Sequence, residues 1–340
     1  MQYKLLIPLM QRRYCWDDDV LLKWWQDMTT RTSHRIGQLI VRLAKSSPAS
    51  DDTLPTMLIV DGQQRLTATT IMASALRHEL MLRRTEDDGA VQETIDWLTR
   101  ILFLPSAPED STMLQALQKG WAEGKALDHA RLTHSFLDRR AYAHVLVQGG
   151  AALLPADDVS PIAQTKHFFD ARASTLSTAD LCIVAKRLFE SVSLMLVDIQ
   201  TRDVNLAQIF HWLQAKHLST HGLLNNPSPG VWFSLIDLLR NVFMANFIYA
   251  PLEEQERVYR REWIPFELHA RQVKDVLVAY IRATKTPTYV PPSASYDLYN
   301  TFMDIYDEQI ETTPPMEILR ALVAIAAKHP AAGDATLIAP

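Results

Sequence analysis

Two short polar clusters near the amino terminus carry the residue types that phosphate chemistry needs. The first contains Gln11, Arg12, Tyr14 and Trp16, and the second is the run Asp61-Gly62-Gln63-Gln64-Arg65. In the second cluster the glycine permits a tight turn, the arginine offers a fork for phosphate oxygens, and a glutamine can position an attacking water. The aspartate would repel a phosphate but can hold Mg²⁺ or orient an arginine. The clusters therefore predict a phosphate site with Arg12 and Arg65 as its cations.

The second cluster lies where a predicted strand turns into a predicted helix. Met57–Val60 is a short apolar run typical of a buried strand, and apolar residues recur at helical spacing from Leu66 to Leu80. A helix that begins here directs unpaired backbone N–H groups and the positive end of its dipole at the cluster. The same residues also fit a plain helix cap, and spacing alone does not choose between the two interpretations. Two consecutive glutamines are more than a cap requires.

The other elements of the first 80 residues are short. Strands are expected at Lys4–Ile7 and Ile36–Leu43, and a helix at Val20–Met28. The three acids Asp17–Asp19 precede that helix, where capping and the helix dipole account for them better than a metal site does. Trp24 and Trp25 lie on its apolar stripe, so we expect them in the core, whereas the roles of Tyr14 and Trp16 stay open.

Helical spacing dominates the chain after residue 90. The expected helices are Val91–Leu104, Ser111–Lys119, Arg131–Val147, Ser160–Ala173, Ala179–Phe189, Leu206–His217, Ser234–Tyr249, Glu253–Glu262, Glu267–Thr284, Tyr296–Gln309 and Met316–Ala327. One more strand is expected at Ser193–Gln200. The pattern predicts an α+β protein in which a small mixed β-sheet packs on a larger helical domain. The expected boundaries are 1–85 for the sheet-containing part, 86–330 for the helical domain and 331–340 for a tail.

Composition limits the classes of protein to consider. The chain has 340 residues with only 10 Gly beside 18 Pro, which favours helices over glycine turns, and its net charge of −5 gives no global basic field for nucleic acid. Residues 1–50 nevertheless carry a net charge of +4, so this part of the chain is where an anionic ligand, if there is one, is expected to bind. Cys15 and Cys182 cannot form a disulfide framework, and no apolar run is long enough to span a membrane. We therefore expect a cytoplasmic protein that does not bind membranes.

Several familiar chemistries find no match. The sequence has no G-x-G-x-x-G, and the segment Gly120–Lys125 is one residue short of a P-loop. His211, His217 and His221 have no cysteine or carboxylate ligand near them in the sequence. A metal site at these histidines is therefore not expected.

The two polar clusters also carry a family resemblance. IPLMQRRYCW followed by LIVDGQQRLTATTIM resembles the amino-terminal module of GmrSD-type modification-dependent restriction proteins, a ParB/sulfiredoxin-like family with the signature I-P-x-x-Q-R-x-Y-x-W and then D-G-Q-Q-R-L-T. The segments Ile209–Phe210, Ser234–Asn241 and Glu262–Glu267 resemble later blocks of the family. The resemblance covers most of residues 5–310.

The resemblance implies a nucleotide-binding and often nucleotide-hydrolysing module that serves in defence against modified foreign DNA. It places the nucleotide between two walls. From the resemblance together with the residue chemistry above, we expect a nucleoside triphosphate with Mg²⁺ at Asp61 and catalysis by Asp61, Gln63 and Gln64. The residues that it implies for binding are Gln11, Arg12, Tyr14, Trp16, Gly62 and Arg65, with Arg240 and Asn241 from the helical part. Family members usually add an HNH nuclease, whose pattern this sequence lacks. We therefore expect a sensor or regulator that works with a separate nuclease subunit and with modified DNA.

Two departures from the family pattern concern the helical part. Leu213–His217 replaces L-N-x-x-G, and residues 218–232 read as an insertion. Ser234 and Asp237 fit a capping box, whereas Arg240 and Asn241 fit either the site or a polar contact between elements.

Trp263 and Phe266 are expected in the core. Two alternative functions stay open at this point, a non-catalytic ParB-like DNA-binding sensor and a degenerate scaffold for protein interactions.

Overall fold

The computed structural model describes residues 3–31, 33–44, 54–85, 88–105, 112, 115, 129–147, 160–199, 209, 234–248, 250–269 and 272–328. The chain divides into two compact units. The first unit comprises Met1–Pro8, Arg13–Asp203 and Ser228–Val231, and the second comprises Leu9–Arg12, Val204–Pro227 and Trp232–Pro340.

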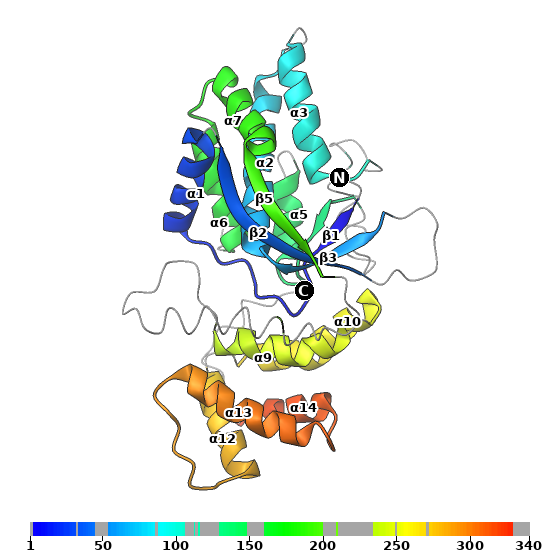
Figure 1. The fold of residues 1–340 in the computed structure, drawn as a ribbon, viewed down its shortest axis with the longest axis vertical. Helices are drawn as coiled ribbons and strands as arrows, with labels where there is room; N and C mark the ends of the chain where they lie inside the picture. Colours follow the sequence, from blue (N-terminus) through cyan, green and yellow to red (C-terminus); the bar gives the residue numbers. More distant parts are fainter. Residues whose placement is uncertain are drawn as a thin grey trace. The chain divides into compact units, whose positions relative to one another are not determined.

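A mixed sheet forms one layer of the first unit. Its described strands are β1 (Lys4–Leu6), β2 (His34–Leu43), β3 (Thr56–Asp61), β4 (Leu132–Thr133) and β5 (Val192–Asp198), in the order β4-β1-β3-β2-β5 (Figure 1). β1 runs parallel to both β3 and β4, whereas β2 runs antiparallel to β3 and parallel to β5. The predicted α+β class is confirmed.

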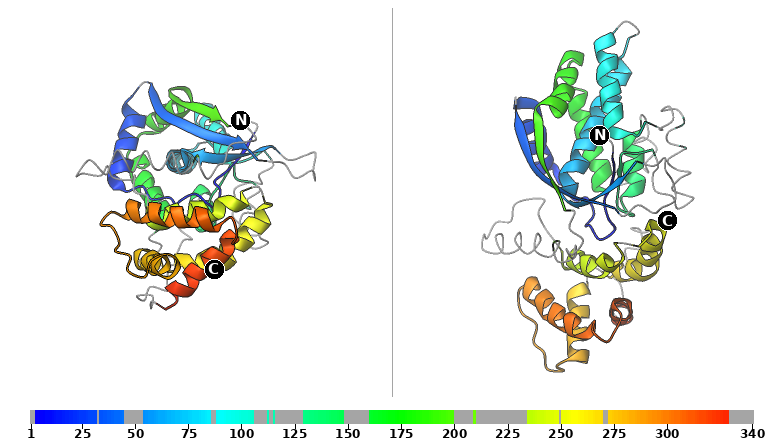
Figure 2. Two further views of the ribbon diagram at one scale, coloured as in Figure 1. Left: turned by 60° about the horizontal axis from the view of Figure 1, so that its bottom comes forward. Right: turned by 45° about the vertical axis from the view of Figure 1, so that its right-hand side comes forward.

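The other described elements of the first unit are helices. They are α1 (Asp18–Thr30), α2 (Gln63–Arg83), α3 (Gly89–Leu102), α5 (Arg139–Leu146), α6 (Pro161–Ala173) and α7 (Thr178–Glu190). α2 packs against α3, α5, α6 and α7, and the sheet curves around its beginning (Figure 2). Its buried residues include Ala68, Ala73 and Ala75, whose small side chains let neighbouring helices approach closely. α2 is thus buried on more than the single stripe that its sequence predicts.

One hydrophobic core joins the sheet to these helices. It includes Leu5 and Ile59 from the sheet, Leu76 of α2, Leu98 of α3 and Leu188 of α7. Helices α3 and α7 therefore belong to the same unit as the sheet. The long middle segment of this unit ends at Asp203.

Most of the helices predicted for this unit lie where they were expected, with ends shifted by a few residues. The prediction of one helix over Arg131–Val147 is wrong, because Leu132 and Thr133 pair with β1 as strand β4 before α5 begins. The expected helices Ser111–Lys119 and Leu206–His217 lie outside the described residues, apart from positions 112, 115 and 209.

The second unit is helical in its described part. α9 (Leu235–Met244) continues into a 3₁₀ turn, η2 (Ala245–Phe247), and α10 (Leu252–Val258) continues through a π-helical turn, η3 (Tyr259–Trp263), into α11 (Ile264–Glu267). α12 (Val273–Thr284), α13 (Ser295–Gln309) and α14 (Pro315–Ala326) follow. Trp263 and Phe266 are fully buried, as predicted. Among the described residues, no helix is long and apolar enough to cross a membrane.

Candidate functional site

The turn between β3 and α2 requires its glycine. Gly62 caps α2 with φ +96°, a left-handed conformation that other residues avoid, and a Cβ there would lie 3.0 Å from the carbonyl oxygen of Gln38. Gly62 itself has no side chain with which to cap the beginning of α2. The positive end of the helix dipole lies at this turn, which is the end of a helix that attracts anions.

Gln64 fastens the first polar cluster to the second. Its Nε2 donates to the carbonyl of Arg13 at 3.0 Å, and its Oε1 accepts the backbone N–H of Cys15 at 3.0 Å. We call residues 13–16 the strap. The strap and the beginning of α2 thus form one local site, with both Gln63 and Gln64 buried.

Arg65 is committed to the backbone of β2. Its two terminal nitrogens donate to the carbonyls of Ile36 at 2.7 Å and Gln38 at 2.8 Å, and its guanidinium lies 3.6 Å from the Asp61 carboxylate. The hydrogen-bond ladder between β2 and β3 ends at the Ile40–Asp61 pair. Beyond that pair, the Arg65 side chain rather than β3 donates hydrogen bonds to the carbonyls of β2. The arginine that the sequence suggested for phosphate therefore holds the sheet.

Gly37 makes room for this arrangement. It has φ +99°, and a Cβ added there would collide with Nη1 of Arg65. The register between β2 and β5 shifts between Arg35 and Gln38, on either side of this glycine. Gly37 is thus the second glycine, after Gly62, that the contact between β2 and α2 requires.

Asp138 holds the strap from the other side. Its Oδ1 accepts from Nε of Arg13 at 3.0 Å, and its Oδ2 accepts the backbone N–H of Tyr14 at 2.8 Å. The Asp138 side chain is only 1% exposed, whereas that of Arg13 is 34% exposed. Sequence analysis missed both residues. The available signal was a run of polar residues, from Thr133 to Arg140, too dense for one amphipathic helix.

His134 extends this polar layer into the interior. Its Nε2 lies 2.9 Å from the hydroxyl of Thr67 on α2, and its Nδ1 lies 3.7 Å from Oδ2 of Asp138. Burial lowers the pKa of His134 to about 4, against a smaller opposing effect of Asp138. The imidazole is therefore neutral near pH 7.

The aromatic residues of the first cluster differ in exposure. Tyr14 is 2% exposed, its hydroxyl accepts from Thr165 at 3.3 Å, and burial raises its pKa. Trp16 is partly buried and meets Trp24 edge to face at 5.2 Å. Tyr14 anchors the strap in the core, whereas Trp16 is partly exposed. Trp24 is buried, as predicted, and Trp25 is partly buried.

Gln11 and Arg12 are placed differently from the rest of the first cluster. Both side chains are buried, and they belong to the segment Leu9–Arg12 of the second unit. The division between the units therefore falls inside the motif, directly before Arg13.

Arg240 and Asn241 lie within the helical unit. Arg240 donates to Asp237 at 2.8 Å and to Glu267 at 2.5 Å, and Glu267 also accepts from Trp263 at 2.8 Å. Burial alone would lower the pKa of Arg240, but the carboxylates raise it above its ordinary value. Ser234 and Asp237 form the predicted capping box. Asn241 is buried in the same helix.

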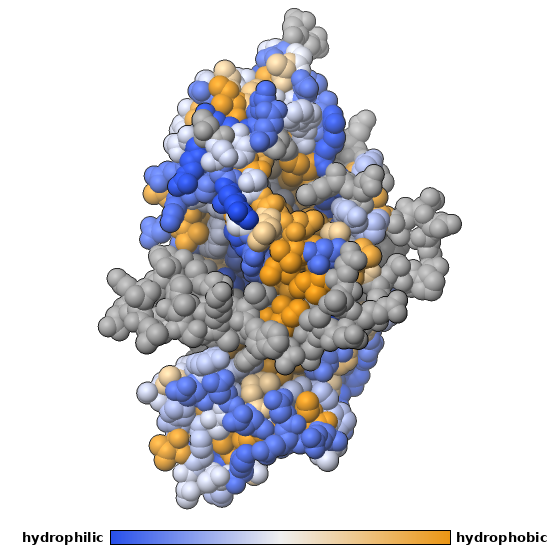
Figure 3. Space-filling view, viewed as in Figure 1, coloured by the Kyte–Doolittle hydropathy of each residue, from blue (hydrophilic) through white to orange (hydrophobic). Residues whose placement is uncertain are grey.

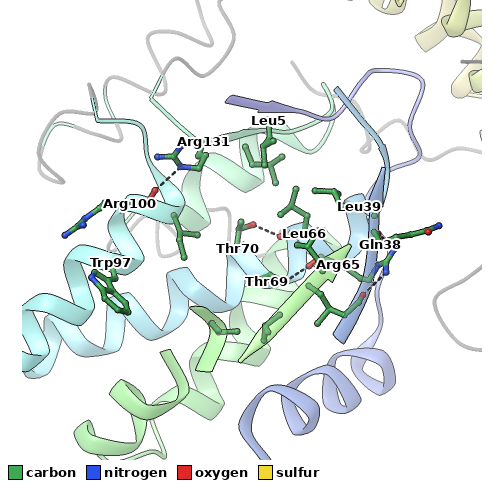
Figure 4. A pocket seen from close by; sticks show the side chains of 17 residues that line it. Leu5, Gln38, Leu39, Arg65, Leu66, Thr69, Thr70, Trp97, Arg100 and Arg131 are labelled. Atoms are coloured by element: carbon green, nitrogen blue, oxygen red, sulfur yellow. Dashed lines mark hydrogen bonds between the residues drawn. The ribbon is translucent and has the colours of Figure 1, made fainter. Parts of the chain in front are cut away.

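A pocket of about 520 Å³ opens beside the beginning of α2 (Figure 4). Gly62, Arg65 and Thr69 line one side, and most of the other lining residues are apolar. Arg131 lines it too, but its guanidinium donates to backbone carbonyls, including that of Arg100 at 2.9 Å. Apolar side chains also gather on the surface of this unit (Figure 3), where Leu196 of β5 is among the exposed residues.

A metal ion at Asp61 would need ligand atoms from a bound phosphate as well as from the protein. Within the described part of the chain, no group of three or more His, Cys, Asp or Glu side chains could hold a metal ion. Asp61 has a side chain that is 39% exposed beside the beginning of α2. Mg²⁺ is commonly held by one or two carboxylates together with phosphate oxygens, so Asp61 fits such a site if a phosphate is present.

A mixed sheet that turns through a glycine into a buried helix, with a polar strap fastened to that turn, defines an α+β unit. The family model for the GmrSD restriction endonuclease, N-terminal domain, matches residues 1–226. The chain belongs to this family, as its two motifs predicted. A comparison with curated proteins found no match.

Proposed function

We propose that this chain is the nucleotide-binding module of a modification-dependent restriction protein and that its ligand is a nucleoside triphosphate with Mg²⁺. The observation that supports this most directly is the union of both family motifs at the beginning of α2. There Gly62 leaves the helix without a side-chain cap, and Gln64 fastens the strap against it. Uncapped helix N-termini bind phosphates through backbone N–H groups.

The same geometry suggests roles for the side chains. Asp61 would hold Mg²⁺ together with phosphate oxygens, since its carboxylate is half-exposed at the end of β3. The amide of Gln64 already binds the strap on both of its polar atoms, so we assign the positioning of a hydrolytic water to Gln63. Trp16 would contact the ligand from the strap.

In the whole system this module would act as a sensor. Nucleotide binding at the strap would regulate a nuclease that cuts modified DNA, whether that nuclease is another subunit or another part of the protein. The role agrees with the family, whose members are restriction endonuclease domains.

The test is isothermal titration with ATP, GTP, CTP and UTP, with and without Mg²⁺. The wild type should bind at least one of them, and Asp61→Asn should remove most of the Mg²⁺ dependence of the affinity. Asp96→Asn is the matched control, because Asp96 is an exposed acid on α3 of the same unit. Absence of binding to every nucleotide would overturn the proposal.

Hydrolysis is tested separately by phosphate release. Gln63→Leu should retain nucleotide affinity and lose turnover, because leucine matches the size of glutamine without its amide. A variant with full turnover would show that water is positioned by another group.

The basic excess of the first 50 residues is the observation behind the DNA-binding alternative. Of these cations, Lys23, Arg31 and Arg35 are exposed, whereas Arg12 and Arg42 are buried. A gel shift on modified and unmodified duplex with a steep salt dependence, in the absence of nucleotide, would support DNA binding instead. Failure to bind either ligand would point to the scaffold alternative.

A further inference from the structure

We propose that Arg13 is the arginine that binds the phosphates of the nucleotide and that Asp138 is the residue that positions it. This inference rests on the proposed function. It departs from the family signature, which fixes arginine at position 12 and leaves position 13 open.

The other arginines of the motifs are committed elsewhere. Both terminal nitrogens of Arg65 donate to carbonyls of β2. Arg12 is 9% exposed and belongs to the second unit, and Arg240 is 2% exposed between two carboxylates. None of these three guanidinium groups presents a free fork beside α2.

Arg13 differs from them in what its side chain leaves unused. Its Nε donates to Asp138, and neither of its two terminal nitrogens has a partner among the residues that the structure describes. With 34% of the side chain exposed, this end of the guanidinium can meet a ligand. Two parallel N–H donors match the geometry of phosphate oxygens.

Asp138 fixes the orientation of that fork. One carboxylate oxygen binds Arg13, while the other accepts the backbone N–H of Tyr14 at 2.8 Å and the hydroxyl of Ser135 at 3.4 Å. A buried carboxylate is costly unless it is paired and hydrogen-bonded. Because His134 is neutral, Arg13 supplies the pairing charge. The guanidinium is thereby held in one orientation before a ligand arrives, which lowers the entropy lost on binding.

The strap places Arg13 beside the beginning of α2. The carbonyl of Arg13 accepts from Nε2 of Gln64, the second residue of the helix. One hydrogen bond therefore joins the Arg13 backbone to the first turn of α2. In the proposed site the phosphate accepts from the backbone N–H groups of α2 and from the Arg13 fork, two kinds of donor that reinforce each other.

The experiment compares triphosphate with nucleoside binding. Whichever nucleotide the wild type binds is titrated alongside its nucleoside, on the wild type, Arg13→Gln, Arg13→Lys and the control Arg35→Gln. Arg35 is an exposed arginine of β2 in the same unit. We expect Arg13→Gln to weaken triphosphate binding about 10- to 100-fold, as loss of hydrogen bonds to a charged group does, and to leave nucleoside binding unchanged.

The positioning role has its own readout. Asp138→Asn retains the shape of the side chain and removes its charge, and it should weaken triphosphate binding while leaving nucleoside binding alone. Circular dichroism confirms that each variant is folded. Should Asp138→Asn fail to fold, Arg13→Lys decides, since lysine keeps the charge without the fork and should recover only part of the lost affinity.

The outcomes separate this inference from the proposed function. If the wild type binds no nucleotide, the proposed function fails. If the wild type binds a triphosphate and Arg13→Gln binds it within twofold, Arg13 is not the phosphate arginine and the proposed function stands. Equal losses for triphosphate and nucleoside would show a structural role for Arg13 and would also overturn the inference.

Discussion

The two units each contain an arginine paired with aspartate, and the pairs differ in what remains unsatisfied. In the helical unit, Arg240 is 2% exposed and meets Asp237 and Glu267, and Glu267 is in turn bound by Trp263. In the sheet-containing unit, Arg13 is 34% exposed and meets Asp138 through Nε alone. In the first arrangement both terminal nitrogens of the arginine meet carboxylates, and the buried Nε of Arg240 lacks a partner among the described residues. In the second, Nε is paired and the two terminal nitrogens are left for a ligand.

This difference teaches how to weigh residues within a motif. Arg240 belongs to a block of sequence that resembles a later block of the family, outside the residues 1–226 that the family model matches, and its carboxylate partners use its charge internally. A buried ion pair whose partners are all present stabilises little, but removing one partner is costly because a charge is left unpaired. We therefore expect mutations in the two regions to separate stability from binding.

The largest expected effect is that of Glu267→Ala. It removes one of the two carboxylates from Arg240 and the acceptor of Trp263, and breaking a buried pair in this way costs about 3–5 kcal/mol. Urea unfolding should show the loss in the helical unit, while nucleotide affinity stays unchanged in the folded protein. Glu253→Ala is the control, because Glu253 is exposed in the first turn of α10. If Glu267→Ala had normal stability and altered nucleotide affinity, the Arg240 cluster would serve binding rather than stability, and its contrast with Arg13 would be wrong.

The next effect is a pH dependence from His134. Its pKa is about 4 in the folded protein, below its ordinary value of 6.5, because the side chain is buried. The unfolded chain thus binds the proton more readily, so the contribution is present above about pH 6.5 and is lost as the pH falls towards 4. The loss is at most about 3 kcal/mol.

The measurement is an NMR titration of the His134 ring together with stability at several pH values. His134→Gln should flatten the slope of stability between pH 4 and 6.5, and the exposed His167→Gln should not. A measured pKa of His134 near 6.5 would contradict the burial of its ring between Thr67 and Asp138.

A smaller effect is expected from Gly37→Ala. The substitution forces a side chain into a positive φ and against Nη1 of Arg65, which costs about 1–3 kcal/mol. Gly89→Ala is the control, because no atom lies within 4 Å of a Cβ placed there. Thermal unfolding compares the two. If Gly37→Ala were as stable as the control, Arg65 would not be held by β2 and would be available to a phosphate again.

The smallest effect is expected from Arg257→Ala in the helical unit. Arg257 donates to Glu254 through two nitrogens, but both side chains are exposed to water. Exposed ion pairs contribute little to stability. The midpoint of urea unfolding should therefore not change at physiological salt. That result would show that the stability of the Arg240 cluster is sensitive to mutation because the cluster is buried, not merely because its charges are paired.

The sequence predicts the local parts of this arrangement well. The strand at Met57–Val60, the turn at Gly62 and the helix after it depend on neighbouring residues, and β3 and α2 lie where they were expected. The strap was expected to meet the second cluster, and Gln64 joins them. Such features follow from periodicity and turn chemistry.

The rest depends on partners distant in the sequence. Arg65 donates to the carbonyls of β2 because the hydrogen-bond ladder between β2 and β3 stops before them. No local sequence pattern reveals where that ladder stops. The two-residue strand β4 forms because it pairs with β1, which is distant in the sequence. The local spacing of its residues predicts a helix instead. Asp138 lies 125 residues after Arg13, and nothing near Arg13 indicates it.

The order of strands also determines when this site can form during synthesis. The strap and α2 are made early, but β1 needs β4, Arg13 needs Asp138, and β2 needs β5 at Val192–Asp198. Contacts between such distant segments close slowly, because loop entropy must be lost before they form. On the ribosome, the nascent chain therefore carries both motifs long before the site can assemble. Until β5 emerges, the edge of β2 that β5 covers stays unpaired and exposed to non-native association.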